Sequence, residues 1–170
     1  MAIEVSNRQR LVRIDHREVI DVAARTLQAA GAPGQTQADI VVAFIRDREI
    51  RRLNATYRGR DLETDVLSFS GGGEYNPDSQ VYLGDIVIST DAVVRQASRA
   101  GHSAGREIDE LVIHGVLHLC GYDHETDQGQ MNRLEIRLRR ALLNTPDTAR
   151  PPKQLRKRPP NRPAKRMSSR

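Results

Sequence analysis

The amino-acid sequence predicts a single α/β (α+β) domain in which a small mixed sheet of about four strands is flanked by helices. The chain of 170 residues is long enough to bury a proper core. Short apolar or alternating segments, typical of strands, are mixed with longer segments whose apolar residues repeat at helical spacing. The two kinds of segment do not alternate strictly, which favours one layered domain with a mixed sheet.

The chain begins with a predicted strand, a helix and a second strand. Residues 2–6 (AIEVS) alternate apolar and polar side chains, as a short strand does. Over residues 15–30, apolar side chains recur at helical spacing, and Gly31 follows as a C-cap. Residues 39–45 (DIVVAFI) form a short apolar run, which predicts the second strand.

A helix and two more strands are expected next. Residues 47–58 (DREIRRLNATYR) predict a helix whose N-terminus is capped by Asp47, because an aspartate side chain accepts hydrogen bonds from free helix amides. Residues 64–69 (TDVLSF) predict a third strand, and a turn-rich segment with consecutive glycines follows it. Residues 81–89 (VYLGDIVIS) predict the fourth strand.

The rest of the domain is predicted to be helical. Ser89 or Thr90 caps a helix that extends to residue 102. Residues 106–121 (REIDELVIHGVLHLCG) predict a second helix, and residues 128–143 (QGQMNRLEIRLRRALL) place their apolar side chains on one face of a third.

The positive charge of the chain is concentrated at its C-terminal end. Residues 146–170 carry nine Lys or Arg residues and one acid, whereas residues 1–145 carry 18 basic and 21 acidic residues. Pro146 ends the last helix, and no apolar periodicity follows it. We therefore expect a folded domain over 1–145 and a disordered basic tail over 146–170 that contacts nucleic acid by nonspecific attraction to phosphates. The alternative is a solubilising tail without a partner.

Cysteine usage and hydropathy favour a soluble cytoplasmic protein. The single cysteine, Cys120, excludes an intramolecular disulfide and fits a reducing compartment. No apolar run approaches the roughly 18 to 20 residues of a membrane helix, and the N-terminal residues lack the pattern of a secretory signal. We therefore expect no membrane partner.

Residues 114–124 (HGVLHLCGYDH) contain three of the five histidines of the chain. His114 and His118 are four positions apart, so they share one helical face with Cβ atoms roughly 5–6 Å apart. Gly121 can adopt the left-handed conformation that reverses the chain and brings His124 back to the same ion. Three histidines with one open position are the format of a catalytic zinc site, and we expect one zinc ion per chain. The alternative is two ordinary buried histidines and one at the surface.

Other residues near the histidines carry weaker signals. Cys120 points about 200° away from His118 around the helix, so we expect a small core residue and not a fourth ligand. Asp123 and Asp127 are either acceptors for the imidazole N–H groups or solvated turn residues. Met131 is expected to be an ordinary core residue.

Zinc peptidases with this histidine spacing place a glutamate directly after the first histidine, where it moves protons between water and the leaving amine. Gly115 occupies that position here and cannot act as a base. An RNA phosphodiester has a different requirement, because its cleavage depends chiefly on positive charge near the phosphoryl oxygens. The motif therefore points away from peptide hydrolysis, although it does not by itself indicate RNA.

The HGVLHLCGYDH motif resembles the signature of the YbeY family, the bacterial rRNA-maturation endoribonucleases. LNATYRGRDLETDVLSF (53–69) and LGDIVIS (83–89) are similar to the same family, and the resemblance extends over about residues 3–143. It implies a metal-dependent endoribonuclease selective for single-stranded RNA, which acts in 16S rRNA 3′-end maturation of the small ribosomal subunit and in ribosome quality control. The zinc ligands that it implies are His114, His118 and His124.

The same resemblance implies that Arg58, in YRGRD, is the functional arginine of the cleft. An arginine in this segment can also clamp a phosphate with its two-pronged guanidinium, whereas the alternative is a solvated arginine close to Arg60. The sequence departs from the family at Glu63, where a proline is usual, and at Ser70, where the family tends to Pro-Phe. Both departures alter the loop around the expected cleft.

Two other functions are compatible with parts of the sequence. A zinc metallopeptidase is supported by the histidine spacing and opposed by Gly115. A non-catalytic ribosome-assembly factor would use a structural metal only to brace the turn after the helix. Metal analysis combined with cleavage of single-stranded RNA would distinguish these functions.

Overall fold

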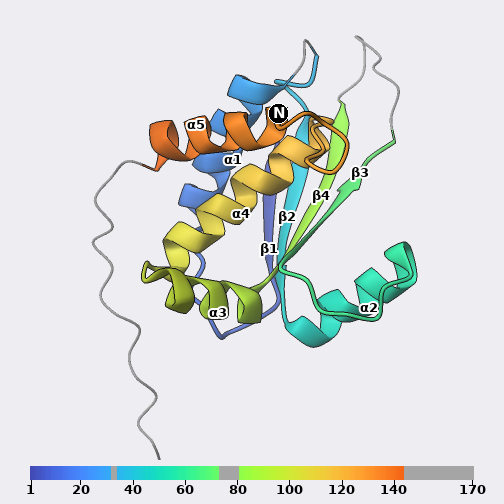
Figure 1. Cartoon of the computed structure of the whole chain (residues 1–170), viewed down its shortest axis with the longest axis vertical. Helices are drawn as coiled ribbons and strands as arrows, with labels where there is room; N and C mark the ends of the chain where they lie inside the picture. The colour runs from blue at the N-terminus through green and yellow to red at the C-terminus, as the bar shows by residue number, and fades with distance from the viewer. Residues whose placement is uncertain (32–33, 73–80, 144–170) are drawn as a thin grey trace, which may run out of the picture.

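The computed structural model describes residues 1–31, 34–72 and 81–143 (Figure 1). Its centre is a four-stranded sheet in the order β1-β2-β4-β3. The strands are β1 (Ile3–Asn7), β2 (Asp39–Ile45), β3 (Val66–Ser70) and β4 (Tyr82–Ser89). Neighbours among β1, β2 and β4 are parallel, whereas β3 is antiparallel to β4 and forms one edge. The predicted fold class, one domain with a small mixed sheet, is confirmed.

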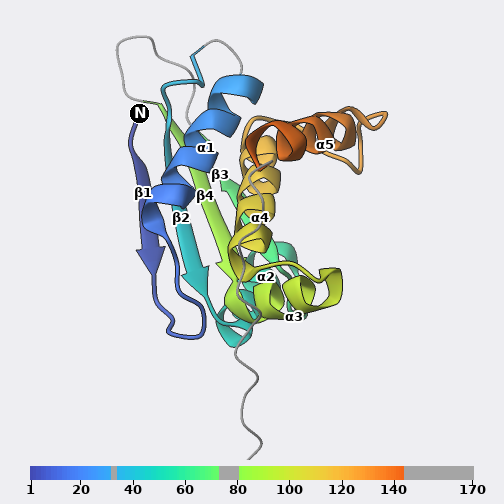
Figure 2. The same ribbon diagram turned by 90° about the vertical axis from the view of Figure 1, so that its left-hand side faces the viewer.

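The described residues also form five helices that pack around this sheet. They are α1 (His16–Ala30), α2 (Asp47–Arg58), α3 (Thr90–Ala100), α4 (Ala104–Leu119) and α5 (Gln130–Leu142). Figure 2 shows α1 and α4 along one face of the sheet, with α5 crossing one end of α4. This arrangement places the C-terminal end of α4, which carries the histidine motif, beside the edge strand β3.

Alternate residues of β4 belong to two apolar clusters on opposite faces of the sheet. Ile86 and Ile88 join the larger cluster, which includes the inner sides of α1, α4 and α5. Val87 joins a smaller cluster with Ile50 of α2. Met131 of α5 is fully buried in the larger cluster, as expected of a core residue. The helices α4 and α2 therefore pack against opposite faces of the same strand, β4.

The bounds of the predicted elements agree with the structure to within two residues at either end. One capping prediction is wrong, because Asp47 lies in the first turn of α2 and Arg46 is the N-cap. The Asp47 carboxylate instead accepts hydrogen bonds from Ser89 Oγ at 2.6 Å and from Arg95 at 2.5 Å. Tertiary contacts with α3 and with its N-cap residue have therefore replaced the local cap.

The predicted basic tail, 146–170, lies outside the described residues, as does the segment 73–80 within the glycine-rich turn. The boundary between domain and tail therefore stays a prediction. Within the part of the chain that the structure describes, no helix is both long and apolar enough to cross a membrane.

Candidate metal centre

The three predicted ligand histidines come together at the C-terminal end of α4. His114 and His118 lie one helical turn apart, and both are half-buried. Gly121 follows the helix with a φ of +92°, a conformation that residues with a side chain rarely adopt. The chain reverses there and brings His124 back, so that one ring nitrogen of each histidine lies within 4.8 Å of the others.

The arrangement of the three rings fits a single metal ion. Nε2 of His114 is 3.1 Å from Nε2 of His118. Two nitrogen ligands at the usual zinc distance are about 3.3 Å apart when the site is tetrahedral. The ring centroid of His118 lies 4.7 Å from that of His114 and 5.3 Å from that of His124. The centroids of His114 and His124 are 5.6 Å apart. Imidazole nitrogens suit zinc and several other transition metals, so these residues could hold such an ion.

Burial and mutual repulsion favour the uncharged form of His118. Burial lowers the pKa of His118 below its ordinary value, and the neighbouring His114 and His124 lower it further. The charge of Asp123 acts in the opposite direction but does not reverse the shift. A histidine must be neutral to offer a lone pair to a metal, so this environment favours the form that binds.

Glu135 of α5 contacts His114, although no motif in the sequence predicts this role for it. A carboxylate oxygen of Glu135 lies 3.3 Å from Nδ1 of His114, and it accepts a hydrogen bond from Arg139 at 2.6 Å. Burial raises the pKa of Glu135, but the hydrogen bond with His114 and the charge of Arg139 outweigh burial and leave it below the ordinary value. The sequence gives no direct signal of this contact, because Glu135 is 21 positions from His114. Its spacing of four from Arg139 could have indicated only an ion pair along α5.

Asp123 and Asp127 are turn residues, the second of the two interpretations drawn from the sequence. Asp123 accepts hydrogen bonds from the Glu125 amide at 3.0 Å and from the Thr126 hydroxyl at 3.2 Å. Asp127 accepts hydrogen bonds from three amides around the start of α5, those of Gly129, Gln130 and Met131. Such contacts satisfy amides that have no partner within the helix. The carboxylate that contacts a ring nitrogen of the motif is instead that of Glu135.

Cys120 has the environment of a small core residue, as predicted. It packs against the larger apolar cluster, and burial raises the pKa of its thiol to about 11. The thiolate is the form that binds metal, and this environment disfavours it at neutral pH.

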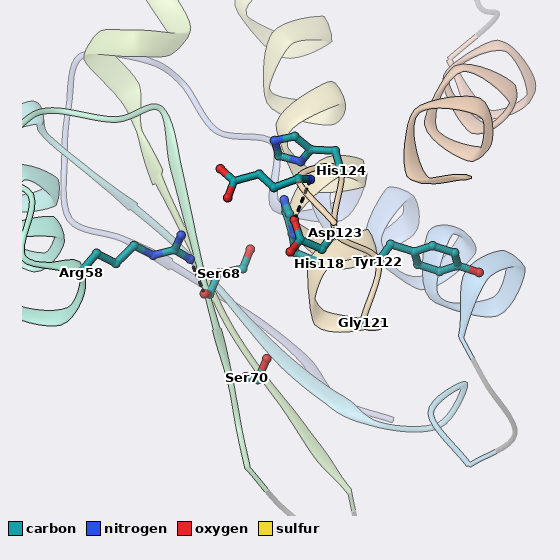
Figure 3. A pocket seen from close by; sticks show the side chains of 9 residues that line it. Arg58, Ser68, Ser70, His118, Gly121, Tyr122, Asp123 and His124 are labelled. Carbon is teal, nitrogen blue, oxygen red and sulfur yellow. Dashed lines mark hydrogen bonds between the residues drawn. The ribbon is translucent and has the colours of Figure 1, made fainter. Parts of the chain in front are cut away.

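His118 and His124 line a cavity of about 340 Å³ that Arg58 also lines (Figure 3). The other lining residues are Ser68, Ser70, Gly121, Tyr122, Asp123 and Glu125. Arg58 is the last residue of α2, and its Nη2 donates a hydrogen bond to the carbonyl oxygen of Ser68 at 3.3 Å. Figure 3 shows the guanidinium beside Ser68 of β3 and pointing toward the side where the histidines lie, whereas the side chain of Tyr122 points away from Arg58. Residues from α2, from the edge strand β3 and from the end of α4 and the turn after it therefore line the same cavity.

Gly115 lies between the first two histidines in sequence, but it faces the sheet. A side chain added there would meet Ile86 of β4. The carbonyl oxygen of Gly115 accepts a hydrogen bond from Ser68 Oγ at 3.3 Å. A glutamate at this position would therefore point into the interface between α4 and β4. The packing of α4 against β4 therefore explains why position 115 lacks the glutamate of the peptidase motif.

A second group of possible ligands, His102, Glu107 and Glu110, has its ligand atoms within 4.8 Å of one another. Its charges are already compensated by protein groups. Glu110 accepts hydrogen bonds from Arg106 at 2.7 Å and from Arg139 at 2.6 Å. Nε2 of His102 lies 3.2 Å from Glu107. A cation here would be repelled by two guanidinium groups, so the three histidines of the motif are the better candidate.

Comparison with known proteins adds to this geometry. The family model described as Endoribonuclease YbeY matches residues 4–143. A relative from Roseiflexus castenholzii named Endoribonuclease YbeY is 44% identical over 134 residues, which are 76% of this chain and 82% of that protein. A Moorella thermoacetica protein of the same name is 44% identical over 122 residues, 66% of this chain and 78% of that protein. A solution structure from Thermotoga maritima is similar in fold, with a TM-score of 0.55, 23% identity, and coverage of 89% of this chain and 99% of that one.

Proposed function

This chain belongs to the endoribonuclease YbeY family, and we propose that it is a zinc-dependent endoribonuclease that cleaves single-stranded RNA. In this proposal one zinc ion per chain is held by His114, His118 and His124, and Arg58 binds the phosphate at the cleavage site. One observation carries the proposal. Arg58 at the end of α2 and two of the histidines near the end of α4 line the same cavity.

The histidines suit an ion that must keep its positive charge. Three neutral imidazoles add no negative charge to a site, unlike carboxylate or thiolate ligands. When bound, a zinc ion supplies Lewis-acid charge to a phosphoryl oxygen. Burial supports the neutral form of His118, and the contact of Nδ1 of His114 with Glu135 leaves Nε2 of that ring for the ion.

Arg58 supplies hydrogen-bond donors on the opposite side of the cavity. A guanidinium has five N–H donors, and its hydrogen bond to the carbonyl oxygen of Ser68 leaves donors for a substrate. The Arg58 side chain is exposed, so a phosphate can replace water at it without disrupting the core. Its planar fork can bind two phosphoryl oxygens and stabilise the charge that develops on them during cleavage.

Asp123 and Glu125 are the lining acids, and both belong to the turn after α4. The hydrogen bond from the Glu125 amide lowers the pKa of Asp123, which makes that carboxylate a weak base. The proposal therefore assigns the main part of catalysis to electrostatic stabilisation, in which Arg58 is the principal protein group.

The finer part of the proposal concerns the substrate. We assign the activity to ribosomal RNA, in 3′-end maturation of 16S rRNA and in quality control of the small ribosomal subunit, within the cytoplasm. Family membership supports this assignment. The net charge of +8 over residues 146–170 would add nonspecific attraction to RNA phosphates.

The test compares three substrates: a single-stranded 16S rRNA 3′-end fragment, the same fragment as a duplex, and a peptide. The wild-type protein should cleave the single strand in preference to the duplex and leave the peptide intact. His118→Ala should abolish cleavage, and His102→Ala, from the second ligand group, should not. Peptide cleavage without RNA cleavage would favour a metallopeptidase. A metal-loaded protein that cleaves none of the three would favour a non-catalytic assembly factor.

A further inference from the structure

Glu135 connects the ring of His114 to a series of ion pairs between α4 and α5. Its Oε1 atom lies 3.3 Å from Nδ1 of His114 and 2.6 Å from Nη2 of Arg139. Nη1 of Arg139 donates to Glu110 of α4 at 2.6 Å, and Arg106 donates to the other carboxylate oxygen of Glu110 at 2.7 Å. The side chains of Glu135 and Glu110 are only 13% and 14% exposed, so solvent screens these contacts weakly.

The contact with Glu135 determines which ring nitrogen of His114 carries the hydrogen. An ionised carboxylate can only accept hydrogen bonds, so Nδ1 must be the donor. In a neutral ring Nε2 is then left with a free lone pair. Nε2 is also the atom that lies 3.1 Å from Nε2 of His118. The nitrogen that faces the other ligands is therefore the one that can bind a metal.

We propose that Glu135 is a positioning residue for the metal ligand His114, and that Arg139 holds the Glu135 carboxylate in the required orientation. This role rests on the metal site of the proposed function and extends it to α5. Among the described residues, α5 contributes none to the lining of the cavity. A carboxylate on the second nitrogen of a ligand histidine fixes the ring and makes the first nitrogen a better donor.

Arg139 has the geometry of a clamp. It lies four residues after Glu135 on α5 and binds one carboxylate on its own helix and one on α4. Without Arg139, the Glu135 side chain could rotate away from His114 at little cost. Arg139→Met keeps most of the apolar stem of the side chain but removes both ion pairs, so it tests the clamp separately from Glu135.

The first experiment measures zinc affinity by competition with a chelator. Glu135→Ala should weaken zinc binding roughly 10- to 100-fold, the usual effect of losing such a partner. Glu135→Gln should lose less zinc affinity than Glu135→Ala, because the glutamine amide oxygen can still accept a hydrogen bond from Nδ1 of His114. The zinc affinity of Arg139→Met should lie between those of the wild type and Glu135→Ala. Glu107→Gln is the matched control, since Glu107 is a buried acid on α4 that contacts His102 instead, and it should bind zinc like the wild type.

The second experiment reads the histidine tautomer by NMR of the metal-free, ¹⁵N-labelled protein. His114 should carry its hydrogen on Nδ1 in the wild type and in Glu135→Gln, and should lose this preference in Glu135→Ala. An unchanged tautomer together with unchanged zinc affinity in Glu135→Ala would overturn the positioning role and leave the proposed function intact. A wild-type protein that binds no zinc would instead overturn the proposed function, whereas loss of the Nδ1 preference in Glu135→Ala would still support the contact with His114.

Discussion

Gly115 of α4 lies so close to Ile86 of β4 that a Cβ atom at position 115 would be 2.6 Å from Cγ2 of Ile86. Two further Ile86 atoms would lie at 3.1 Å and 3.2 Å. Glycine therefore lets α4 approach the sheet, and this approach places His114 and His118 near the edge strand. The feature that argued against peptide hydrolysis is at the same time a packing requirement of this fold.

The first prediction tests this packing. Alanine is normally about 1 kcal/mol better than glycine inside a helix. Gly115→Ala should nevertheless lower the free energy of unfolding, by about 1–2 kcal/mol, because overpacking outweighs helix propensity. In an Ile86→Ala background the same change should become stabilising, since all three close atoms are gone. Urea unfolding would measure both effects.

Gly105 provides a control on the same helix. A Cβ atom there would meet only Ser103 Oγ, at 3.8 Å. Gly105→Ala should therefore be neutral or stabilising. If Gly115→Ala behaves like Gly105→Ala, the contact with Ile86 is not a constraint.

The local parts of this fold were predictable because they depend on short-range patterns. The bounds of β2 and α2 follow from an apolar run and from helical spacing, and both match the structure. Asp47 failed as an N-cap because Ser89 and Arg95, more than 40 positions away, bind its carboxylate. No local pattern carries that information.

The same distinction applies to the candidate site. The spacing of the histidines predicted that they would meet, because a helical turn and a reversing glycine bring them together within 11 residues. The contact of Glu135 with His114 depends on how α5 crosses α4, which is set by core packing. Its separation of 21 positions therefore gave no local signal of contact.

The second prediction concerns metal content. Wild-type protein should bind about one zinc ion per chain, whereas His114→Ala and His118→Ala should lose it. His102→Ala should keep the ion, because Glu110 of the second ligand group is already paired with Arg106 and Arg139. Elemental analysis after gel filtration would measure the stoichiometry. Full zinc occupancy in both motif variants would eliminate the proposed site.

The third prediction is a pH dependence of stability. Burial of Asp109, together with the negative charge of Glu18, raises the pKa of Asp109 from 3.8 to about 7. Its folded-state pKa lies above the unfolded value, so the folded protein binds more protons and stability falls as pH rises from about 4 to 7. Asp109→Asn removes this loss. After allowance for partial solvent screening, this substitution should raise the free energy of unfolding by roughly 1–3 kcal/mol above pH 7. Below pH 4 it should change the free energy of unfolding by nearly zero.

Chemical unfolding at pH 4, 5.5 and 7.5 would test this prediction. Asp21→Asn is the control, because Asp21 is an exposed residue of α1 that pairs with the exposed Arg25. A gain for Asp109→Asn that does not change with pH would show that the charge of Asp109 is not the cause.

The fourth prediction concerns residues 146–170, whose net charge is +8. A chain that ends at Thr145 should keep its zinc and its cleavage of RNA but bind RNA more weakly. Its affinity should also depend less steeply on salt, because fewer phosphate contacts release fewer counterions. Binding isotherms at several salt concentrations would measure the slope. Loss of zinc or of cooperative unfolding after truncation would mean that the tail belongs to the folded domain.

The last prediction concerns Arg58. Since Gly115 provides no base and Asp123 is a weak one, Arg58 should carry a large share of the electrostatic work in this proposal. Arg58→Ala should leave zinc content and thermal stability nearly unchanged, because its exposed side chain supports no core contact. Losing a donor to the developing charge should cost about 2–4 kcal/mol, or roughly 30- to 1000-fold in the rate of single-stranded RNA cleavage.

Two further variants separate position and geometry from charge. Arg58→Lys keeps the positive charge but cannot make the two-pronged contact, so it should recover only part of the rate. Arg60→Ala removes another exposed arginine, two positions away, that does not line the cavity, and this variant should cleave nearly as fast as the wild type. Equal losses in Arg58→Ala and Arg60→Ala would mean that only the overall positive charge of this segment matters. A wild-type rate in Arg58→Ala would remove Arg58 from the active site, whereas a large loss there alone, with zinc retained, would make its guanidinium the phosphate clamp.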